Sequence, residues 1–233
     1  EALVKTGKPV VMVLFTGRPM TIAWEDANMN AILNTWFGGS EAGEAISNVL
    51  FGDVNPSGKI TMTFPRTVGQ CPIYYNHKNN PRPAKAKHKT FRRYNSNWFH
   101  CSMQPLYPFG YGLSYTQFSF TDLQVLDPEV AMGEDVRVKV RVTNVGEVPG
   151  TTVAQLYIRD KVASTTRPVR ELKGFERVSL EPGASAEVLF TITAADMAFC
   201  REDMKFAQEP GEFGLWVGES CEAELEGKFI VKE

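Results

Sequence analysis

One serine lies in a setting where it could act as a nucleophile. The turn Gly38-Gly39-Ser40-Glu41-Ala42 nearly matches the G-x-S-x-G nucleophile elbow of hydrolases, with alanine in place of the last glycine. A serine hydrolase also needs an acid and then a histidine later in the chain. The histidines that follow, His77, His88 and His100, lie in a basic segment with a loop-like composition. We therefore expect Ser40 to be the N-cap of a helix rather than a nucleophile.

Two pairs of carboxylates could in principle perform the acid–base chemistry of glycoside hydrolysis, which needs two such groups. They are Glu25 with Asp26 and Glu41 with Glu44. The helix dipole favours carboxylates in the first turn of a helix, which explains Glu41 and Glu44 without a catalytic role. A polar turn explains Glu25 and Asp26 equally well. We assign no catalytic residue within this chain.

Aromatic side chains between residues 74 and 107 could stack on sugar rings: Tyr74, Tyr75, Trp98, Phe99 and Tyr107. Side chains of this kind also anchor long loops against a neighbouring domain, because they bury a large apolar area. The sequence leaves both interpretations open.

The segment between His77 and Arg93 is strongly basic, with seven lysines and arginines and no acidic residue. Such a run could contact phosphate groups. The whole chain, however, has 25 lysines and arginines against 27 aspartates and glutamates, a formal charge of −2. This near-balance excludes a strongly basic nucleic-acid-binding protein. We expect a solvated connecting loop and no nucleic-acid partner.

The four cysteines, Cys71, Cys101, Cys200 and Cys221, are too few for a disulfide-rich scaffold. They have no CxxC spacing and no paired histidines near them, which argues against a zinc site. A bridge between Cys200 and Cys221 is possible in an oxidising compartment, and four unpaired thiols are at least as good an interpretation. We expect no metal and no cofactor.

The elements that position these side chains begin with an α/β pattern in residues 1–65. The continuous apolar run 10–15 is typical of a strand buried on both faces of a parallel sheet, and 31–37 is a second strand candidate. A helix is expected over 40–51 and a third strand over 59–64. About three strands are too few for a complete layer, so this part needs upstream sequence.

Residues 118–233 are predicted to be all-β, after a segment at 66–117 that shows little periodicity. Within 135–143, valines alternate with polar residues, which places one face of a strand in a core and the other in water. Further strands are expected at 118–125, 152–159, 172–179, 186–192, 212–218 and 226–231. Seven strands in about 115 residues fit an immunoglobulin-like or fibronectin-III-like sandwich.

The length and the first residues indicate part of a larger protein. The 233 residues suffice for one large domain or two small ones. The longest apolar run is far shorter than the ~20 residues that cross a bilayer, so no membrane partner is expected. The chain opens with Glu1-Ala2-Leu3-Val4-Lys5, which has neither an initiator methionine nor the pattern of a signal peptide.

Several motifs resemble the C-terminal region of glycoside hydrolase family 3, in the same order along nearly the whole chain. Its C-terminal α/β domain is resembled by WFGGSEAG at 36–43 and VLFGDVNPSGKI at 49–60. Its connecting segment is resembled by PIYYNHK at 72–78 and PLYPFGYGLSYT at 105–116. Its fibronectin-III-like domain is resembled by QLYIRD at 155–160, RPVRELKGF at 167–175 and EPGEF at 209–213.

The resemblance is to the periplasmic type of β-glucosidase. It implies a partial α/β/α sandwich domain at 1–65, a connecting segment at 66–117 and a fibronectin-III-like sandwich at 118–233. It also implies a retaining mechanism with an Asp nucleophile and a Glu acid/base. In the family the nucleophile lies on an N-terminal (β/α)8 barrel of about 250 residues, which cannot fit in this chain. The acid/base lies upstream of the strand at 10–15, so both catalytic residues would precede Glu1.

By the same resemblance, the substrate is a β-linked glucoside or oligosaccharide, the missing barrel is a partner in cis, and the location is periplasmic or extracellular. The candidate substrate-binding residues are Tyr75, His77 and Arg82 on the connecting segment. The isolated chain is expected to be inactive. The alternative is a non-catalytic carbohydrate-binding or interaction module of family 3 ancestry.

The sequence departs from the family pattern at two places. After Lys78 the usual Asn-Thr-Gly-Arg-Pro is Asn79-Asn80-Pro81-Arg82-Pro83, and a lysine-rich stretch follows. If this loop lines the side of the leaving group, the leaving-group preference would be altered. Cys200 stands where the fibronectin-III-like domain typically has tyrosine, which argues against a required disulfide.

Overall fold

The computed structural model describes residues 1–80, 82, 94–96, 98 and 100–233. The chain forms two compact units, each of which brings together segments that are distant in the sequence. The first unit contains Glu1–Val54, Met62–Ile73 and Arg82–Tyr107, and the second contains Asn55–Thr61, Tyr74–Pro81 and Pro108–Glu233. Most of the basic run lies outside the described residues, as do His88 and Phe99.

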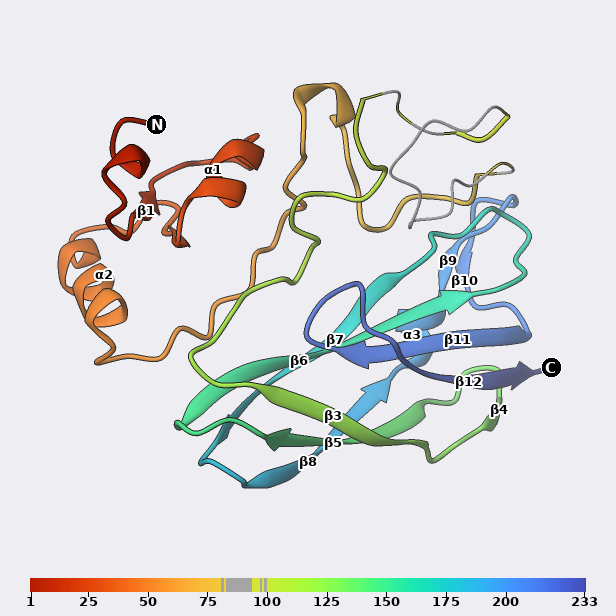
Figure 1. The fold of residues 1–233 in the computed structure, drawn as a ribbon. Coiled ribbons are helices and arrows are strands. Elements are labelled where there is room, and N and C mark those ends of the chain that lie inside the picture. Colours follow the sequence, from red (N-terminus) through yellow and green to blue (C-terminus); the bar gives the residue numbers. More distant parts are fainter. Residues whose placement is uncertain (81, 83–93, 97, 99) are drawn as a thin grey trace. The chain divides into compact units, whose positions relative to one another are not determined.

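The first unit has the predicted α/β character. Strand β1 (Val11–Leu14) pairs in parallel with β2 (Ala31–Asn34), with the first residues of the two strands opposite each other. Helix α1 (Ala23–Asn28) connects the two strands, and α2 (Ala42–Phe51) follows β2 (Figure 1). Two short 3-10 helices also belong to this unit: Val4–Thr6 and Val68–Gln70.

Helix α2 begins later than predicted, and no side chain caps its start. The N-cap residue is Glu41, whose side chain makes no capping hydrogen bond, so the prediction that Ser40 caps this helix is wrong. The prediction of a polar turn at Glu25 and Asp26 is also wrong, because both residues lie in the first turn of α1. There they place negative charge near the positive end of the helix dipole, as Glu44 does in α2.

Residues 59–64 do not form the predicted third strand. Their backbone groups bond to the connecting segment instead of to β2. In the first unit Phe64 N–H donates to Tyr107 O at 2.9 Å, and in the second unit Gly110 N–H donates to Ile60 O at 2.8 Å. Within the described part of the chain, the pairing of Phe64 with Tyr107 is an isolated bridge. Alternation alone does not separate a strand from an extended segment that is paired elsewhere.

The second unit is a sandwich of two sheets, as predicted (Figure 1). The five-stranded sheet has the order β4-β12-β11-β6-β7, and the three-stranded sheet has the order β3-β5-β8. The strands of the five-stranded sheet are β4 (Glu129–Ala131), β6 (Gly150–Asp160), β7 (Glu171–Leu180), β11 (Gly211–Gly218) and β12 (Leu225–Lys232). Those of the other sheet are β3 (Phe118–Val125), β5 (Val136–Asn144) and β8 (Ser185–Ile192).

The seven predicted strands of the sandwich are all present, and four shorter elements were not predicted. These are β4, the two-stranded sheet of β9 (Phe199–Cys200) and β10 (Phe206–Ala207), and helix α3 (Ala194–Met197). Each of them is two to four residues long, which is too short for a period of two or of 3.6 residues to be visible.

The core of the sandwich lies between its two sheets. The alternating valines of β5, at 136, 138, 140 and 142, are fully buried, and they belong to one cluster with Leu156 on β6 and Leu215 on β11. Burying such a side chain contributes about 1.5–3 kcal/mol. The alternation in the sequence therefore correctly predicts both the strand and which of its two faces is buried.

The four cysteines are unpaired in this structure, so the bridge between Cys200 and Cys221 is not formed. Burial raises the pKa of the Cys221 thiol to about 11. The Cys221 thiol, whose thiolate would be the reactive form, therefore stays protonated at neutral pH. Among the described residues, no helix combines the length and the apolar character that crossing a membrane requires.

Candidate functional site

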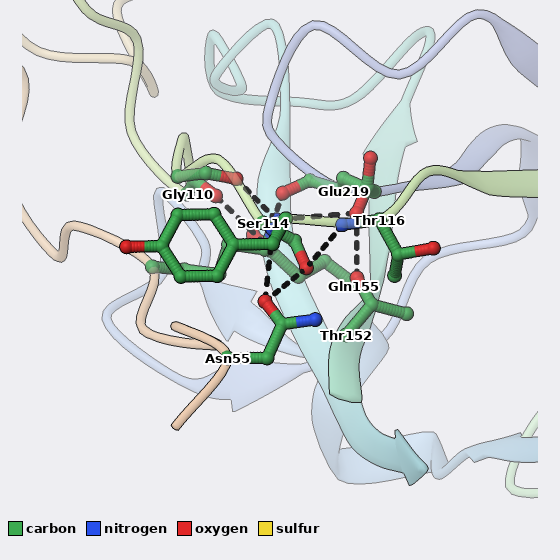
Figure 2. A network of polar contacts seen from close by, with 10 residues as sticks. Asn55, Gly110, Ser114, Thr116, Thr152, Gln155 and Glu219 are labelled. Atoms are coloured by element: carbon green, nitrogen blue, oxygen red, sulfur yellow. Dashed lines mark hydrogen bonds and ion pairs between the residues drawn. The ribbon is translucent and has the colours of Figure 1, made fainter. Parts of the chain in front are cut away.

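A buried polar network in the second unit begins at Gln155 on β6 (Figure 2). The Gln155 side chain is 3% exposed, and its Nε2 donates to Gly110 O at 3.1 Å and to Glu219 O at 2.5 Å. Its Oε1 accepts a hydrogen bond from the Tyr157 hydroxyl at 2.6 Å. Buried amides need such partners, since each unmade hydrogen bond costs about 1–3 kcal/mol. Gln155 therefore joins the connecting segment to the loop after β11.

The same loop supplies a carboxylate that binds a buried lysine. Glu219 Oε1 accepts from Lys59 Nζ at 3.2 Å and from Thr152 Oγ1 at 2.6 Å. Lys59 Nζ also donates to Gly112 O at 2.6 Å, and the Lys59 side chain is only 10% exposed. A lysine buried to this degree requires a charged partner because desolvation is costly. Glu219 is that partner.

Two glycines of the connecting segment allow this close approach. Gly110 has φ = 83°, and a Cβ at this position would lie 2.2 Å from Oε1 of Gln155. At Gly112, a Cβ would lie 2.2 Å from the carbonyl oxygen of Gly58. Neither position accepts a side chain without displacing its neighbours, so the spacing of glycines in the FGYG motif reflects packing.

Asn55 ties the segment 55–61 to two further parts of the second unit. Its Oδ1 accepts from the Ser114 hydroxyl and from Tyr115 N–H, both at 2.8 Å, and its Nδ2 donates to Pro149 O at 2.8 Å. The network thus holds three loop segments against the end of the sandwich. Its groups are paired with one another, and its chemistry is that of a structural anchor.

Tyr75, a candidate substrate-binding residue, is partly buried in the second unit. Its ring stacks on that of Phe109, with centroids 4.3 Å apart, and meets that of Tyr157 edge-on at 5.9 Å. Its hydroxyl accepts from Leu172 N–H at 3.2 Å. Burial raises the pKa of the Tyr75 hydroxyl, so this group stays protonated.

The other two candidates lie in different units. His77 is exposed in the second unit, with Nδ1 3.0 Å from Lys78 O, and its carbonyl accepts from Val169 N–H at 2.9 Å. Arg82 is exposed in the first unit, and its carbonyl accepts from Ser96 N–H at 2.9 Å.

The side chains first considered for catalysis occupy simple surroundings. Ser40, Glu41 and Glu44 are exposed. Asp26 Oδ1 accepts a hydrogen bond from the Tyr107 hydroxyl at 2.6 Å, which links α1 to the connecting segment within the first unit. In the part of the chain that the structure describes, no three His, Cys, Asp or Glu side chains are grouped so as to hold a metal ion.

Comparison with known proteins bears on both units. The model of the glycosyl hydrolase family 3 C-terminal domain matches residues 1–115, and that of the fibronectin type III-like domain matches residues 152–221. The chain belongs to glycosyl hydrolase family 3. The network of Figure 2 joins residues from both of these matches, since Asn55 and Gly110 lie in the first and Gln155 and Glu219 in the second.

The family 3 relatives are longer than this chain. The chain is 46% identical over 228 residues to the periplasmic beta-glucosidase of Salmonella typhimurium, a match that covers 98% of this chain and 30% of that protein. It is 42% identical over 224 residues to a beta-xylosidase of Formosa agariphila, covering 96% of this chain and 30% of that protein. A crystal structure of a beta-glucosidase from Listeria innocua in complex with glucose superposes with a TM-score of 0.93 at 38% identity, over 99% of this chain and 32% of that one. The chain thus spans about 30% of the length of these proteins.

The motifs of the sequence resemble family 3, but their residue types predict no role for Lys59, Gln155 or Glu219. Lys59 lies in the alternating stretch 59–64, which predicts a strand, and a polar residue in such a stretch is expected on the solvent face. The two glycines of FGYG, which are separated by one tyrosine, do indicate that another group lies close to the backbone here. Their partners, Gln155 and Gly58, become visible only in three dimensions.

Proposed function

We propose that this chain is the C-terminal part of a retaining β-glucosidase that hydrolyses terminal non-reducing β-D-glucosyl residues. The catalytic barrel and both catalytic carboxylates would lie in upstream sequence. The superposition on a beta-glucosidase over 99% of the chain, at a TM-score of 0.93, carries this proposal. The share of about 30% that the chain represents in its relatives is consistent with it.

In this proposal the chain completes and supports an active site whose reacting groups lie elsewhere. The first unit contributes two parallel strands and two helices to an α/β domain. The second unit holds the segments 55–61 and 108–116 through Lys59, Gly110 and their bonds to Glu219 and Gln155. It holds the segment 74–80 through the bonds of Leu172 N–H to the Tyr75 hydroxyl and of Val169 N–H to His77 O.

Tyr75, His77 and Arg82 remain our candidate substrate-binding residues. Because the ring and hydroxyl of Tyr75 already have partners, its contribution would be to hold the segment that carries His77. The exposed side chains of His77 and Arg82 would make the direct contacts. The substrate would be a β-linked glucoside or oligosaccharide, and similarity to a periplasmic protein supports a periplasmic or extracellular location.

The test compares this chain with the product of the complete gene. Both proteins are purified and incubated with an aryl β-glucoside, and release of the aryl group is measured. We expect turnover by the complete protein and none by the 233-residue chain. Turnover by the isolated chain would contradict the proposal, because the reacting groups would then lie within it. Sugar binding without hydrolysis by the complete protein would favour a non-catalytic binding module.

A further inference from the structure

The carboxyl edge of the parallel pair β1–β2 is the place in the first unit where a ligand site is expected. In open α/β sheets, ligands bind outside the carboxyl ends of the strands. Here the strands end at Leu14 and Asn34, which lie opposite each other. The loops 15–18 and 35–40 leave the sheet at this edge, and neither the anchoring network nor the candidate residues of the connecting segment include them.

An exposed aromatic ring is held in place at this edge. Phe37 is 85% exposed, although its ring lies against the backbone of the neighbouring loop. A Cβ at Gly17 would be 2.8 Å from Cε2 and Cζ of Phe37, so the absence of a side chain there leaves room for the ring. The neighbouring loop is itself fixed, since Thr16 Oγ1 donates to Arg18 O at 2.8 Å and accepts from Arg18 N–H at 3.3 Å. The ring is therefore a supported platform with an open face.

Two further observations at the same edge indicate an incomplete polar environment. Asn34, the last residue of β2, has both Nδ2 and Oδ1 buried without a hydrogen-bond partner in the described structure. Buried polar side chains in native proteins have partners in the large majority of cases, so such an amide calls for a specific explanation. Trp36, two residues later, has φ = 50°, a strained conformation for a bulky residue and one that clusters at functional sites.

We propose that this edge binds the leaving-group sugar of a β-linked oligosaccharide. Phe37 would stack on the apolar C–H face of the sugar ring, and the Asn34 amide and the exposed Arg18 guanidinium would hydrogen-bond to its hydroxyls. A saccharide offers both kinds of surface at once, an apolar ring face and a rim of hydroxyls, which matches an aromatic platform beside unpaired polar groups. The inference rests on the proposed β-glucosidase function and adds a subsite to it.

The experiment measures KM and kcat of the complete gene product for two substrates. One is a β-1,4-linked glucose disaccharide, whose leaving group is a sugar, and the other is methyl β-glucoside, whose leaving group is too small to reach a platform. Phe37→Ala is expected to raise KM for the disaccharide about two- to twelvefold, because an aromatic contact of this kind is worth about 0.5–1.5 kcal/mol. KM for methyl β-glucoside should stay unchanged. Phe37→Leu, which lacks the ring face, should behave like Phe37→Ala, whereas Phe37→Tyr should retain the wild-type KM.

Phe51→Ala is the matched control. Phe51 is 82% exposed in the same unit, at the last residue of α2, and a helix of this length places it about 14 Å from the helix start. Its substitution should leave KM for both substrates unchanged.

Asn34→Leu separates ligand binding from a purely structural role. Replacing an unsatisfied buried amide by an apolar side chain of similar size should leave stability unchanged or raise it. If Asn34 binds a sugar hydroxyl, the same variant raises KM for the disaccharide alone, about threefold or more.

Unchanged KM for the disaccharide in Phe37→Ala and Asn34→Leu would overturn the inference while leaving the proposed function intact. Equal changes for both substrates, or a Phe37→Ala protein with a lowered melting temperature and normal KM, would also overturn it. In the last case other protein covers the ring. If the unmodified protein hydrolyses neither substrate, the proposed function fails. In that case the disaccharide is titrated calorimetrically into the unmodified and Phe37→Ala proteins. A higher Kd in Phe37→Ala supports the subsite, and an equal Kd contradicts it.

Discussion

Lys59 Nζ lies 3.2 Å from the carboxylate of Glu219, a residue 160 positions away in the sequence. The lysine precedes the connecting segment, and the glutamate follows the β11 strand of the sandwich. Lys59 also donates to Gly112 O, and Glu219 also accepts from Thr152, so each charge has a neutral partner as well. This pair connects residues from the two parts of the chain that separate family models recognise.

Removing one charge of this pair should destabilise the second unit. Lys59→Met leaves Gly112 O without its donor and Glu219 without its cation. Losing one partner of a fully buried pair costs about 3–5 kcal/mol. Since the Glu219 side chain is 39% exposed, water compensates in part, and we expect a loss of about 2 kcal/mol. Urea unfolding followed by far-UV circular dichroism, which reports on the sheets of the sandwich, would measure it.

An exposed ion pair on the same unit provides the control. Lys139 and Glu187 are 3.2 Å apart, with 31% and 54% of their side chains exposed. Lys139→Met should cost less than about 1 kcal/mol. Equal losses of unfolding free energy in Lys139→Met and Lys59→Met would mean that the buried pair of Lys59 stabilises the protein no more than an exposed pair does.

Gly110→Ala should be among the most damaging single-methyl additions in the chain. The new Cβ would lie 2.2 Å from Oε1 of Gln155. Gln155 cannot move away without losing its three hydrogen bonds, and the left-handed backbone at φ = 83° is itself unfavourable for alanine. We expect a loss of about 3 kcal/mol, measured as the change in the free energy of unfolding.

Gly183→Ala isolates the contribution of backbone strain in that prediction. Gly183 has φ = 75°, but a Cβ there would meet no atom within 4 Å. Its substitution should cost about 1 kcal/mol, from strain alone. If Gly110→Ala and Gly183→Ala lower the free energy of unfolding equally, the Gln155 side chain can move aside, and the contact does not explain why residue 110 is glycine.

How much of this fold the sequence predicts depends on the range of the interactions involved. The valines of β5 alternate over nine residues, and that local period determined both the strand and its buried face. Residues 59–64 carry a similar period, yet their hydrogen-bond partners lie more than 40 positions away in the connecting segment. No local pattern distinguishes the two cases.

The candidate site shows the same division. Resemblance located the segments that contain Lys59, Gly110 and Gln155, but roles for these residues require knowledge of which carbonyl or carboxylate each one meets. Tyr75 shows the opposite effect, because its residue type allowed both stacking on a sugar and anchoring of a loop, and only the resemblance made it a candidate substrate-binding residue. In the structure its ring stacks on Phe109 and its hydroxyl is bonded to the backbone.

Ser40→Ala tests the interpretations of Ser40 that the sequence raised. The side chain neither caps α2 nor lies buried, so the substitution should change the free energy of unfolding by less than about 0.5 kcal/mol. It should also leave glycoside hydrolysis by the complete protein unchanged. A large loss of activity would show that Ser40 takes part in the reaction.

Thr193 is a real cap against which Ser40 can be compared. It begins α3 with a capping box, in which its hydroxyl accepts from Asp196 N–H and the Asp196 carboxylate accepts from Thr193 N–H. Thr193→Ala should therefore cost about 1 kcal/mol in urea unfolding. Equal effects of Ser40→Ala and Thr193→Ala would contradict the assignment of the caps.

The Asp160 carboxylate should make the stability of the sandwich depend on pH. Asp160 ends β6 and is 6% exposed, and burial is the main cause that raises its pKa to about 6. The hydrogen bond from Val162 N–H and the nearby Arg167 act in the opposite direction, while Glu209 and Glu171 add to the rise. The folded state therefore binds the proton of the Asp160 carboxyl group more tightly than the unfolded state does. The contribution of Asp160 to stability should be greatest below pH 4, where the group is protonated. It should fall by about 2 kcal/mol as the pH rises from 4 to 6.

Asp160→Asn should remove that fall, since the amide does not titrate and its oxygen can still accept from Val162 N–H. Asp127→Asn is the control of opposite sign. Two hydrogen bonds from the Arg137 side chain and one from its backbone N–H lower the pKa of Asp127 to about 2, so its stabilisation is present above pH 4 and is lost as the pH falls toward 2. The free energy of unfolding should be measured at pH 4, 5, 6 and 7. In Asp160→Asn it should no longer fall as the pH rises, whereas in Asp127→Asn it should fall as steeply as in the wild type. A wild-type slope in Asp160→Asn would mean that another group titrates in this range.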